Sequence, residues 1–113
     1  MPILKIQTNA AIEDQKALMS DATDFLSGLL NKPRDYIMIL LEPGNMLFAG
    51  ESDPTAYIEL KSIGFPVDNT KEVSEKLCDF IYGWLHVPQD RIYIEFTDSE
   101  RNMLGWNGKT FGG

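Results

Sequence analysis

The first residues of the chain hold the group with the most unusual chemistry. Met1 precedes Pro2, so removal of Met1 would leave Pro2 with a free secondary amine at the head of a mostly apolar segment. Such an amine can act as a base or as a nucleophile, which no proline inside a chain can do. The alternative is that Pro2 only begins a strand, a position that tolerates proline because it has no N–H to donate.

The composition is typical of one globular domain and argues against several classes of function. The chain has 113 residues, and we expect a single domain spanning residues 1–113. Its formal net charge of -7 disfavours phosphate backbones and anionic bilayers, so no nucleic-acid partner is expected. With one cysteine, Cys78, one chain can form no internal disulfide, and with one histidine, His86, a zinc site is not expected. We therefore expect no cofactor.

The N-terminus has no basic stretch followed by a long apolar run, and nowhere do roughly 18 apolar residues stand together. These features predict no membrane span and a cytoplasmic location. Export by a route without a signal peptide stays open.

The first half of the chain predicts a strand, a helix and a second strand. Residues 3–7 favour a short strand, and Thr8-Asn9 indicates a turn or a helix cap. An amphipathic helix of about 18 residues is expected next, ending at Asn31-Lys32-Pro33 because the residue before a proline avoids the α region. Residues 36–41 are nearly all apolar, which is typical of a strand covered on both faces. The apolar face of the helix comprises Leu18, Ala22, Phe25, Leu26, Leu29 and Leu30.

The second half predicts the same order of elements. A minor strand over residues 46–48 and a main strand over residues 56–63 are followed by a helix, for which Asn69 and Glu72 form a possible capping box. His86 is expected to cap that helix or lie on the surface. Residues 91–96 favour a fourth strand, and the tail predicts turns with a short strand near Leu104 and Trp106. The buried stripe of the helix comprises Val73, Leu77, Phe80, Ile81, Trp84 and Leu85.

These two halves are related by an internal repeat. The pattern P-x-D-x-I-x-I begins at Pro33 and again at Pro88, and the apolar helix positions align at the same spacing. We interpret the chain as two β-α-β units, approximately residues 2–42 and 56–97. The predicted fold is α+β, a two-layer α/β arrangement with a four-stranded mixed sheet and two helices on one face. Because the other face has no cover within the chain, a second subunit is the simplest partner for it.

Laid out in this way, the chain resembles the macrophage migration inhibitory factor family of the tautomerase superfamily over essentially its whole length. Members of this family are duplicated β-α-β units that assemble as trimers, so the resemblance implies a homotrimer with active sites between subunits. The features that carry the resemblance are Met1-Pro2, Thr8-Asn9, Asn31-Lys32-Pro33 followed by Tyr36-Ile37, Ser62-Ile63-Gly64, Asp90-Arg91-Ile92-Tyr93-Ile94, and Gly105-Trp106-Asn107 with Phe111.

The resemblance implies a keto–enol tautomerase acting on aryl pyruvates of the phenylpyruvate and hydroxyphenylpyruvate type, with dopachrome as a further candidate substrate. By correspondence, Pro2 is the catalytic base, Lys32 binds the substrate carboxylate, and Ile63 lines the pocket and contributes a backbone group. Tyr93 is implied to close the pocket from a neighbouring subunit. The positions of pocket-wall residues in the family are occupied here by Ile3, Tyr36, Leu104, Trp106 and Phe111.

This chemistry also has its own physical requirements. Removing a proton from carbon next to a carbonyl needs a base that is neutral near the working pH. Burial in an apolar pocket and a nearby lysine would both lower the pKa of the Pro2 amine. Lys32 could pair with a carboxylate, and each aromatic contact with an aryl ring would contribute about 0.5–1.5 kcal/mol.

Ordinary structural roles remain open for the same residues. Lys32 could complement the dipole at the end of a helix. Tyr93 alternates with Ile92 and Ile94 and could be an ordinary surface residue of a strand. Trp106 and Phe111 could simply pack the tail.

Two positions depart from the best-known animal members of the family. Glu95 stands where those have an asparagine, and a carboxylate there would repel an anionic substrate unless it is protonated or tied to a cation. Their Cys-x-x-Cys corresponds to residues 55–58, Thr-Ala-Tyr-Ile, so no thiol–disulfide oxidoreductase activity is expected. The rival hypothesis is a cytokine-like, protein-binding trimer with weak or vestigial tautomerase activity.

Overall fold

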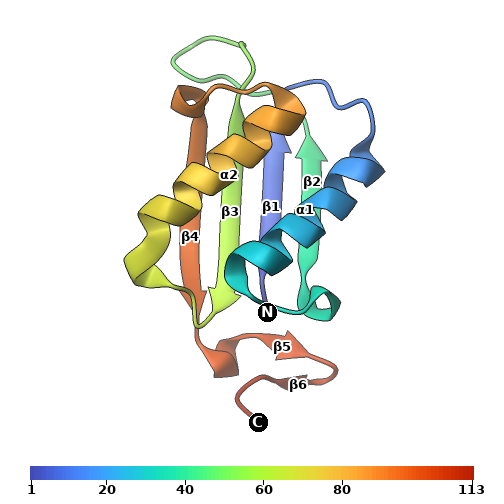
Figure 1. Cartoon of the computed structure of the whole chain (residues 1–113), viewed down its shortest axis with the longest axis vertical. Helices are drawn as coiled ribbons and strands as arrows, with labels where there is room; N and C mark the ends of the chain where they lie inside the picture. Colours follow the sequence, from blue (N-terminus) through green and yellow to red (C-terminus); the bar gives the residue numbers. More distant parts are fainter.

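Four strands form one sheet, and two helices lie across one of its faces (Figure 1). The computed structural model describes residues 1–113. The strand order is β2-β1-β3-β4, in which β1 pairs with β2 and β3 with β4 in parallel, while β1 and β3 are antiparallel. The main elements are β1 (Ile3–Thr8), α1 (Gln15–Leu30), β2 (Met38–Pro43), β3 (Ala56–Ile63), α2 (Thr70–Leu85) and β4 (Ile92–Ser99).

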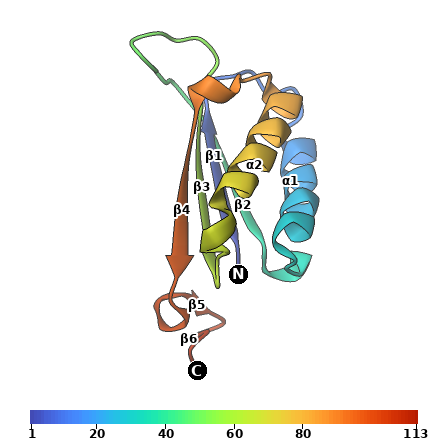
Figure 2. The ribbon, with the colours of Figure 1, turned by 60° about the vertical axis from the view of Figure 1, so that its left-hand side comes forward.

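The predicted duplication has a direct structural counterpart. One β-α-β unit comprises β1, α1 and β2, and the other comprises β3, α2 and β4. Both helices lie on the same side of the sheet when it is viewed nearly edge-on (Figure 2). The mixed four-stranded sheet with two helices on one face is therefore confirmed.

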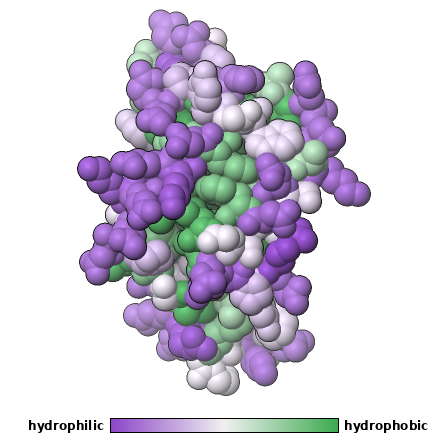
Figure 3. Space-filling model, in the orientation of Figure 1, coloured by the Kyte–Doolittle hydropathy of each residue, from purple (hydrophilic) through white to green (hydrophobic).

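The hydrophobic core fills the space between the helices and the sheet. Alternate residues of β1, namely Leu4, Ile6 and Thr8, are fully buried, as a strand with one covered face requires. The helices meet above this core where Phe25 and Phe80 stack, with ring centroids 4.5 Å apart. Apolar side chains reach the surface along the line between the helices, between hydrophilic flanks (Figure 3). Buried core residues from the helices are Leu18, Ala22, Leu26, Val73, Leu77, Cys78, Ile81 and Leu85.

Helix α1 begins later than Thr8-Asn9 would place a cap. Its N-cap is Asp14, whose side chain accepts a hydrogen bond from the Ala17 N–H at 2.9 Å. Asn9 instead binds the loop of residues 44–55, which connects β2 to β3. Its Nδ2 donates to the carbonyl oxygen of Ser52 at 3.1 Å, and its Oδ1 accepts from the Thr55 N–H at 2.8 Å. The helix ends at Asn31 in the left-handed conformation, immediately before Lys32.

The capping box predicted for α2 is wrong in its hydrogen bonding. Asn69 occupies the N-cap, but its side chain makes no capping hydrogen bond. The residues before it form a short 3-10 turn and leave Asn69 with φ -115° and ψ 19°, outside the extended conformation in which an N-cap side chain reaches back to the helix. His86 does cap the C-terminus, with φ 56°.

Three strand boundaries also differ from the prediction. Strand β2 begins at Met38 rather than Tyr36, because residues 34–36 form a 3-10 turn. The minor strand expected over residues 46–48 is reduced to one bridge between Phe48 and Glu51. Strand β4 continues to Ser99. The tail contains the expected short strand as β5 (Gly105–Trp106), which pairs with β6 (Lys109–Thr110).

The sheet face opposite the helices is mixed in character rather than apolar. Met38 and Leu40 of β2 are 55% and 39% exposed on it. On the central strands, however, the strict alternation brings Lys5 and Glu59 to this face, where their charged groups lie 3.1 Å apart. The apolar part of this face therefore lies on β2, where residues 36–41 predicted a strand covered on both faces, whereas β1 and β3 carry charged side chains here.

Replacing the N-cap of α1 tests the assigned helix start. Asp14→Ala removes the acceptor for the Ala17 N–H and is expected to lower the free energy of unfolding by about 1 kcal/mol. Urea denaturation followed by circular dichroism at one fixed protein concentration measures this loss. Glu13→Ala, at an exposed neighbouring position, should leave the midpoint almost unchanged. Equal losses in the two variants would contradict the assignment.

Candidate active site

The N-terminus lies at one end of the sheet, beside the C-terminal hairpin formed by β5 and β6 (Figure 1). Pro2 is buried, and its carbonyl oxygen accepts a hydrogen bond from the Met38 N–H at 3.0 Å. This bond continues the parallel pairing of β1 with β2 and fixes the start of the chain against the sheet. The Met1 residue that carries the terminal amine is half-buried.

Three influences lower the pKa of the terminal amine. Burial is the largest, because removing an amine from water disfavours its charged form. The positive charges of Lys32 and Arg101 lower it further. The amine at this position is therefore neutral over a wider pH range than an ordinary terminal amine.

An aromatic cavity of about 180 Å³ opens at the same place. We call it the N-terminal cavity. Tyr36 meets Trp106 edge-on at 5.5 Å between ring centroids, and Trp106 stacks on Phe111 at 6.0 Å. The tail is held in this position because the Phe111 N–H donates to the Leu104 carbonyl oxygen at 3.1 Å. The lining residues are Met1, Ile3, Asp35, Tyr36, Ile37, Met38, Leu104, Gly105, Trp106 and Phe111.

Five residues implied as pocket walls thus come together around Met1. They are Ile3, Tyr36, Leu104, Trp106 and Phe111, from β1, the turn before β2 and the tail. This arrangement gives a mostly apolar site next to the start of the chain, with aromatic walls of the kind that pack against a flat ring.

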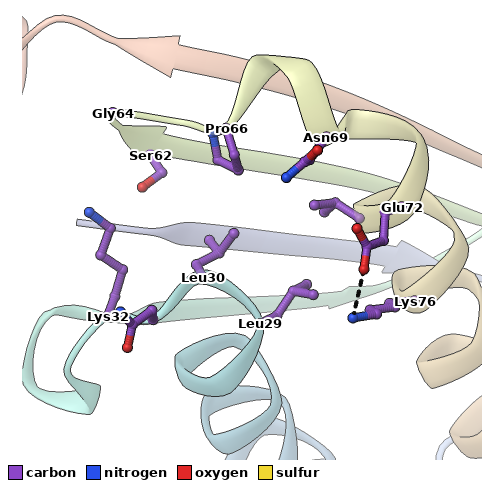
Figure 4. Close-up of a pocket in the computed structure, with 11 residues that line it drawn as sticks. Leu29, Leu30, Lys32, Ser62, Gly64, Pro66, Asn69, Glu72 and Lys76 are labelled. Atoms are coloured by element: carbon purple, nitrogen blue, oxygen red, sulfur yellow. Dashed lines mark ion pairs between the residues drawn. The ribbon is translucent and has the colours of Figure 1, made fainter.

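Lys32 lies on a second cavity, of about 330 Å³, between the end of α1 and the start of α2 (Figure 4). Its side chain extends toward the end of β3, where Ser62 and Gly64 lie. The backbone of Lys32 is fixed to α1, because the Ser27 hydroxyl donates to its carbonyl oxygen at 2.6 Å. Although Lys32 does not line the N-terminal cavity, its charge still lowers the pKa of the terminal amine.

Ile63 differs from the other implied pocket residues because it is buried, with 7% of its surface exposed, and lines neither cavity. It precedes Gly64, whose φ of +67° allows the chain to turn out of β3. Ile63 therefore sits within the strand end that Lys32 approaches.

Tyr93 and Glu95 are not brought to the N-terminal cavity within one chain. Both project from β4 on the face opposite the helices, and Tyr93 is 66% exposed. The register pairs Tyr93 with Tyr57 and Tyr57 with Gln7. Gln7 is five residues from Pro2, which corresponds to about 16 Å along a strand. In this chain alone, Tyr93 lies near the opposite end of the sheet from Pro2.

The 44–55 loop supports Tyr93. Phe48 contacts Tyr93 edge-on, with ring centroids 5.1 Å apart, and the Arg91 guanidinium lies 5.3 Å from the centre of the Phe48 ring. Arg91 also donates to the carbonyl oxygens of Pro54 and Glu51, each at 3.0 Å. These contacts hold the loop and the Tyr93 ring in one arrangement.

Sequence reasoning missed two side chains that contact or influence the candidate site residues, those of Tyr57 and Arg101. The Tyr57 hydroxyl donates to Oε2 of Glu95 at 2.6 Å, a contact that depends on the register between β3 and β4. Arg101 adds a positive charge near the terminal amine, and its Nε donates to the Phe111 carbonyl oxygen at 3.2 Å. The position of Arg101 just before the aromatic tail was the signal available for it.

No group of three or more His, Cys, Asp or Glu side chains is arranged to hold a metal ion. Neither helix combines the length and the apolar character that a membrane crossing would need.

Comparisons with known proteins find relatives that match almost the whole chain. The family model described as macrophage migration inhibitory factor matches residues 1–112. The macrophage migration inhibitory factor of Xenopus tropicalis is 37% identical over 114 aligned positions, covering 98% of this chain and 99% of its own length. The homolog from Brugia malayi is also 37% identical, covering 99% and 100% of the two chains.

Solved structures give the same result. The crystal structure of a macrophage migration inhibitory factor homologue from Prochlorococcus marinus has a TM-score of 0.91 and 42% sequence identity, covering 97% of this chain and 99% of that one. The structure of the factor from Trichinella spiralis also has a TM-score of 0.91, with 29% identity and coverage of 96% and 99%.

Proposed function

This chain belongs to the macrophage migration inhibitory factor family of the tautomerase superfamily, and on that premise we propose that it catalyses keto–enol tautomerisation of aryl pyruvates, with Pro2 as the base. Substrates of the phenylpyruvate and hydroxyphenylpyruvate type fit best, and dopachrome is a further candidate. The observation that carries the proposal is the position of the terminal amine, which adjoins an aromatic cavity and has its pKa lowered by burial and by Lys32.

Removal of Met1 is the first requirement. Cleavage of the Met1–Pro2 bond frees the nitrogen of Pro2 as the new terminal amine. In the full chain Pro2 is buried, whereas Met1 is half-buried. Desolvation, the main cause of the lowered pKa of the Met1 amine, is expected to act on the Pro2 amine as well. A neutral amine has a free electron pair and can accept a proton near pH 7.

The reaction is a balanced internal proton transfer. Pro2 takes a proton from the carbon between the aryl ring and the carbonyl group, and the electron pair of that C–H bond forms the C=C bond as the carbonyl oxygen becomes an enolate. Protonation of that oxygen gives the enol, and the reverse steps restore the ketone. No oxidant, reductant or cofactor is consumed.

Lys32 has the role of pairing with the substrate carboxylate at the end of β3. The aromatic walls of the N-terminal cavity, including Tyr36 and Trp106, hold the aryl ring. Donors near the enolate oxygen supply the electrostatic stabilisation that such intermediates need. The backbone near Ile63 has this role in our proposal.

A neighbouring subunit completes the site in this proposal. Tyr93 is separated from Pro2 by about 16 Å along the strands, so Tyr93 can close a pocket only on another chain. The exposed apolar side chains of Met38 and Leu40 at the β2 edge supply surface for such a contact. A homotrimer with active sites between subunits satisfies both observations.

Sedimentation tests the assembly. At micromolar protein concentration we expect a mass about three times that of the 12.8 kDa chain, because an isolated subunit exposes apolar side chains along β2. Analytical ultracentrifugation measures this mass directly. A single species with the mass of one chain, in a sample that shows catalytic activity, would contradict a site shared between subunits.

The enzyme assay separates the proposal from its rival. A chain whose N-terminal proline has been verified by intact mass should accelerate ketonisation of enol-phenylpyruvate, followed by ultraviolet absorbance. If a folded trimer with a free Pro2 amine shows no rate above background, the cytokine-like, protein-binding role becomes the better hypothesis. That role is the one suggested by the names of the relatives.

A further inference from the structure

The tail after β4, residues 100–113, supplies aromatic walls of the N-terminal cavity but has little packing of its own. It projects beyond the end of the sheet (Figure 1), and none of its apolar residues belongs to the hydrophobic core or packs against it. Trp106 is 49% exposed even though it lines the cavity. The position of the tail therefore depends on a few specific contacts near the start of the chain.

Arg101 joins the two ends of this tail. It begins the short 3-10 turn Arg101–Met103, and its Nε donates to the carbonyl oxygen of Phe111 at 3.2 Å. On the other side of the same residue, the Phe111 N–H donates to the Leu104 carbonyl oxygen at 3.1 Å. The backbone of Phe111 is thus held by both of its polar groups, and the ring that stacks on Trp106 is held with it.

A close backbone approach lies next to this hydrogen bond. A Cβ atom at Gly112 would lie 3.1 Å from the Cβ atom of Asn102 and 3.2 Å from its Cα atom, closer than the roughly 3.5–4.0 Å of ordinary carbon contacts. Asn102 follows Arg101 and Gly112 follows Phe111, so the two segments that Arg101 joins are in direct contact. A larger residue at position 112 would push these segments apart.

The Arg101 side chain is directed to the start of the chain rather than to a surface ion pair. Its guanidinium makes no ion pair with any carboxylate of the chain. Its charge, together with burial and Lys32, lowers the pKa of the Met1 amine, and such an effect weakens with distance. Arg101 therefore lies beside the cavity that Met1 and Phe111 line.

This inference rests on the proposed function, in which the N-terminal cavity receives the aryl ring. We propose that Arg101 is a positioning residue, which holds Phe111 and the stacked Trp106 over the cavity so that the aromatic walls are in place before the substrate binds. Arg101 acts through these two rings and does not touch the reacting atoms. Ring contacts remote from the reacting carbon stabilise the bound substrate and the transition state alike, so their loss raises KM more than it lowers kcat.

Two variants break the same contact in different ways. Arg101→Met removes the donor and nearly keeps the side-chain length, whereas Gly112→Ala displaces the Phe111 segment and leaves Arg101 intact. In each, exchange of the Phe111 N–H measured by NMR should become about 10-fold faster, because the tail opens more often. KM for phenylpyruvate should rise about 3- to 10-fold, the range for one lost hydrogen bond, and kcat should change by less than about twofold.

Matched controls make the same chemical changes without breaking the contact. Lys109→Met removes another exposed positive charge of the tail, and Gly44→Ala adds a Cβ atom at a position with nothing within 4 Å of it. Neither should change the Phe111 exchange rate or KM. Arg101 and Gly112 are exposed, so both test variants should keep the circular dichroism spectrum and the sedimentation mass of the natural protein.

The outcomes separate this inference from the proposed function. Unchanged exchange of the Phe111 N–H in both variants would overturn the inference and leave the tautomerase intact. Faster exchange with an unchanged KM would show that the tail does not hold the ring, and a fall in kcat at constant KM would assign Arg101 to the chemical step; either result overturns the positioning role. If the natural protein has no activity on any aryl pyruvate, the proposed function fails and the role of Arg101 in ring binding fails with it.

Discussion

Masking the amine of Pro2 is expected to lower kcat/KM for phenylpyruvate by about 100- to 10,000-fold, the usual contribution of a positioned general base. A short uncleaved extension before Met1 makes the Pro2 nitrogen part of a peptide bond, where it has no basic electron pair. The extended and natural chains are compared in the same ultraviolet assay, with their N-termini verified by intact mass. Equal activity in the two would contradict a role for the amine.

Pro2→Gly gives a graded version of this experiment. Glycine keeps a terminal amine and the backbone carbonyl oxygen that accepts from the Met38 N–H, but loses the buried ring that fixes the amine. We expect kcat/KM to fall, but less than in the extended chain, because the amine remains while its position is no longer fixed. Pro88→Gly, at an exposed internal site, is the matched control and should retain activity.

Lys32→Met is expected to have the second largest effect. The substitution keeps the length of the side chain and removes a charge-assisted contact with the substrate carboxylate, so KM should rise about 10- to 100-fold. The methyl ester of phenylpyruvate lacks the carboxylate, and the variant should act on it almost as well as the natural protein does. Lys76→Met, at a second lysine of the same cavity that is paired with Glu72, is the control.

The same variant has a predicted effect on the pH profile. Lys32 lowers the pKa of the Met1 amine and is expected to act on the Pro2 amine in the same way, so its removal should raise the pKa of the Pro2 amine. Because only the neutral amine acts as a base, the acid limb of kcat/KM should move to higher pH. If the acid limb stays in place and KM is unchanged, Lys32 has only the alternative role of complementing the helix dipole at the end of α1.

The architecture could be predicted from the sequence because several local signals agreed. The repeat beginning at Pro33 and Pro88, and the apolar stripes of the two helices, indicated the same β-α-β unit twice. The sequence left Thr8-Asn9 open between a turn and a helix cap. The contacts of Asn9 with the 44–55 loop and the capping hydrogen bond of Asp14 rule out the cap.

The site was predicted in part. Residues near one another along the fold, such as Ile3 and Tyr36, follow from parallel pairing of the first two strands, and they do line the N-terminal cavity. The separate cavity beside Lys32 depends on how the ends of α1 and β3 meet, which periodicity does not encode.

The Tyr57–Glu95 contact could not be predicted for a similar reason. A one-residue change of register would move Tyr57 to the helix-facing side of the sheet, so the contact requires the exact pairing of β3 with β4. The sequence alone left Glu95 as a carboxylate without an explanation. The contact gives the Glu95 side chain a defined orientation.

The pH dependence of the rate, measured on a chain whose N-terminal proline is verified by intact mass, tests the central claim most directly. The acid limb of kcat/KM reports the pKa of the base in the free enzyme. Our account predicts a limb clearly below the ordinary α-amino range of about 7.7–8.0, because burial and Lys32 both lower the pKa of the Met1 amine and are expected to act on the Pro2 amine in the same way. A limb within that range, or activity that persists when the amine is masked, would contradict it.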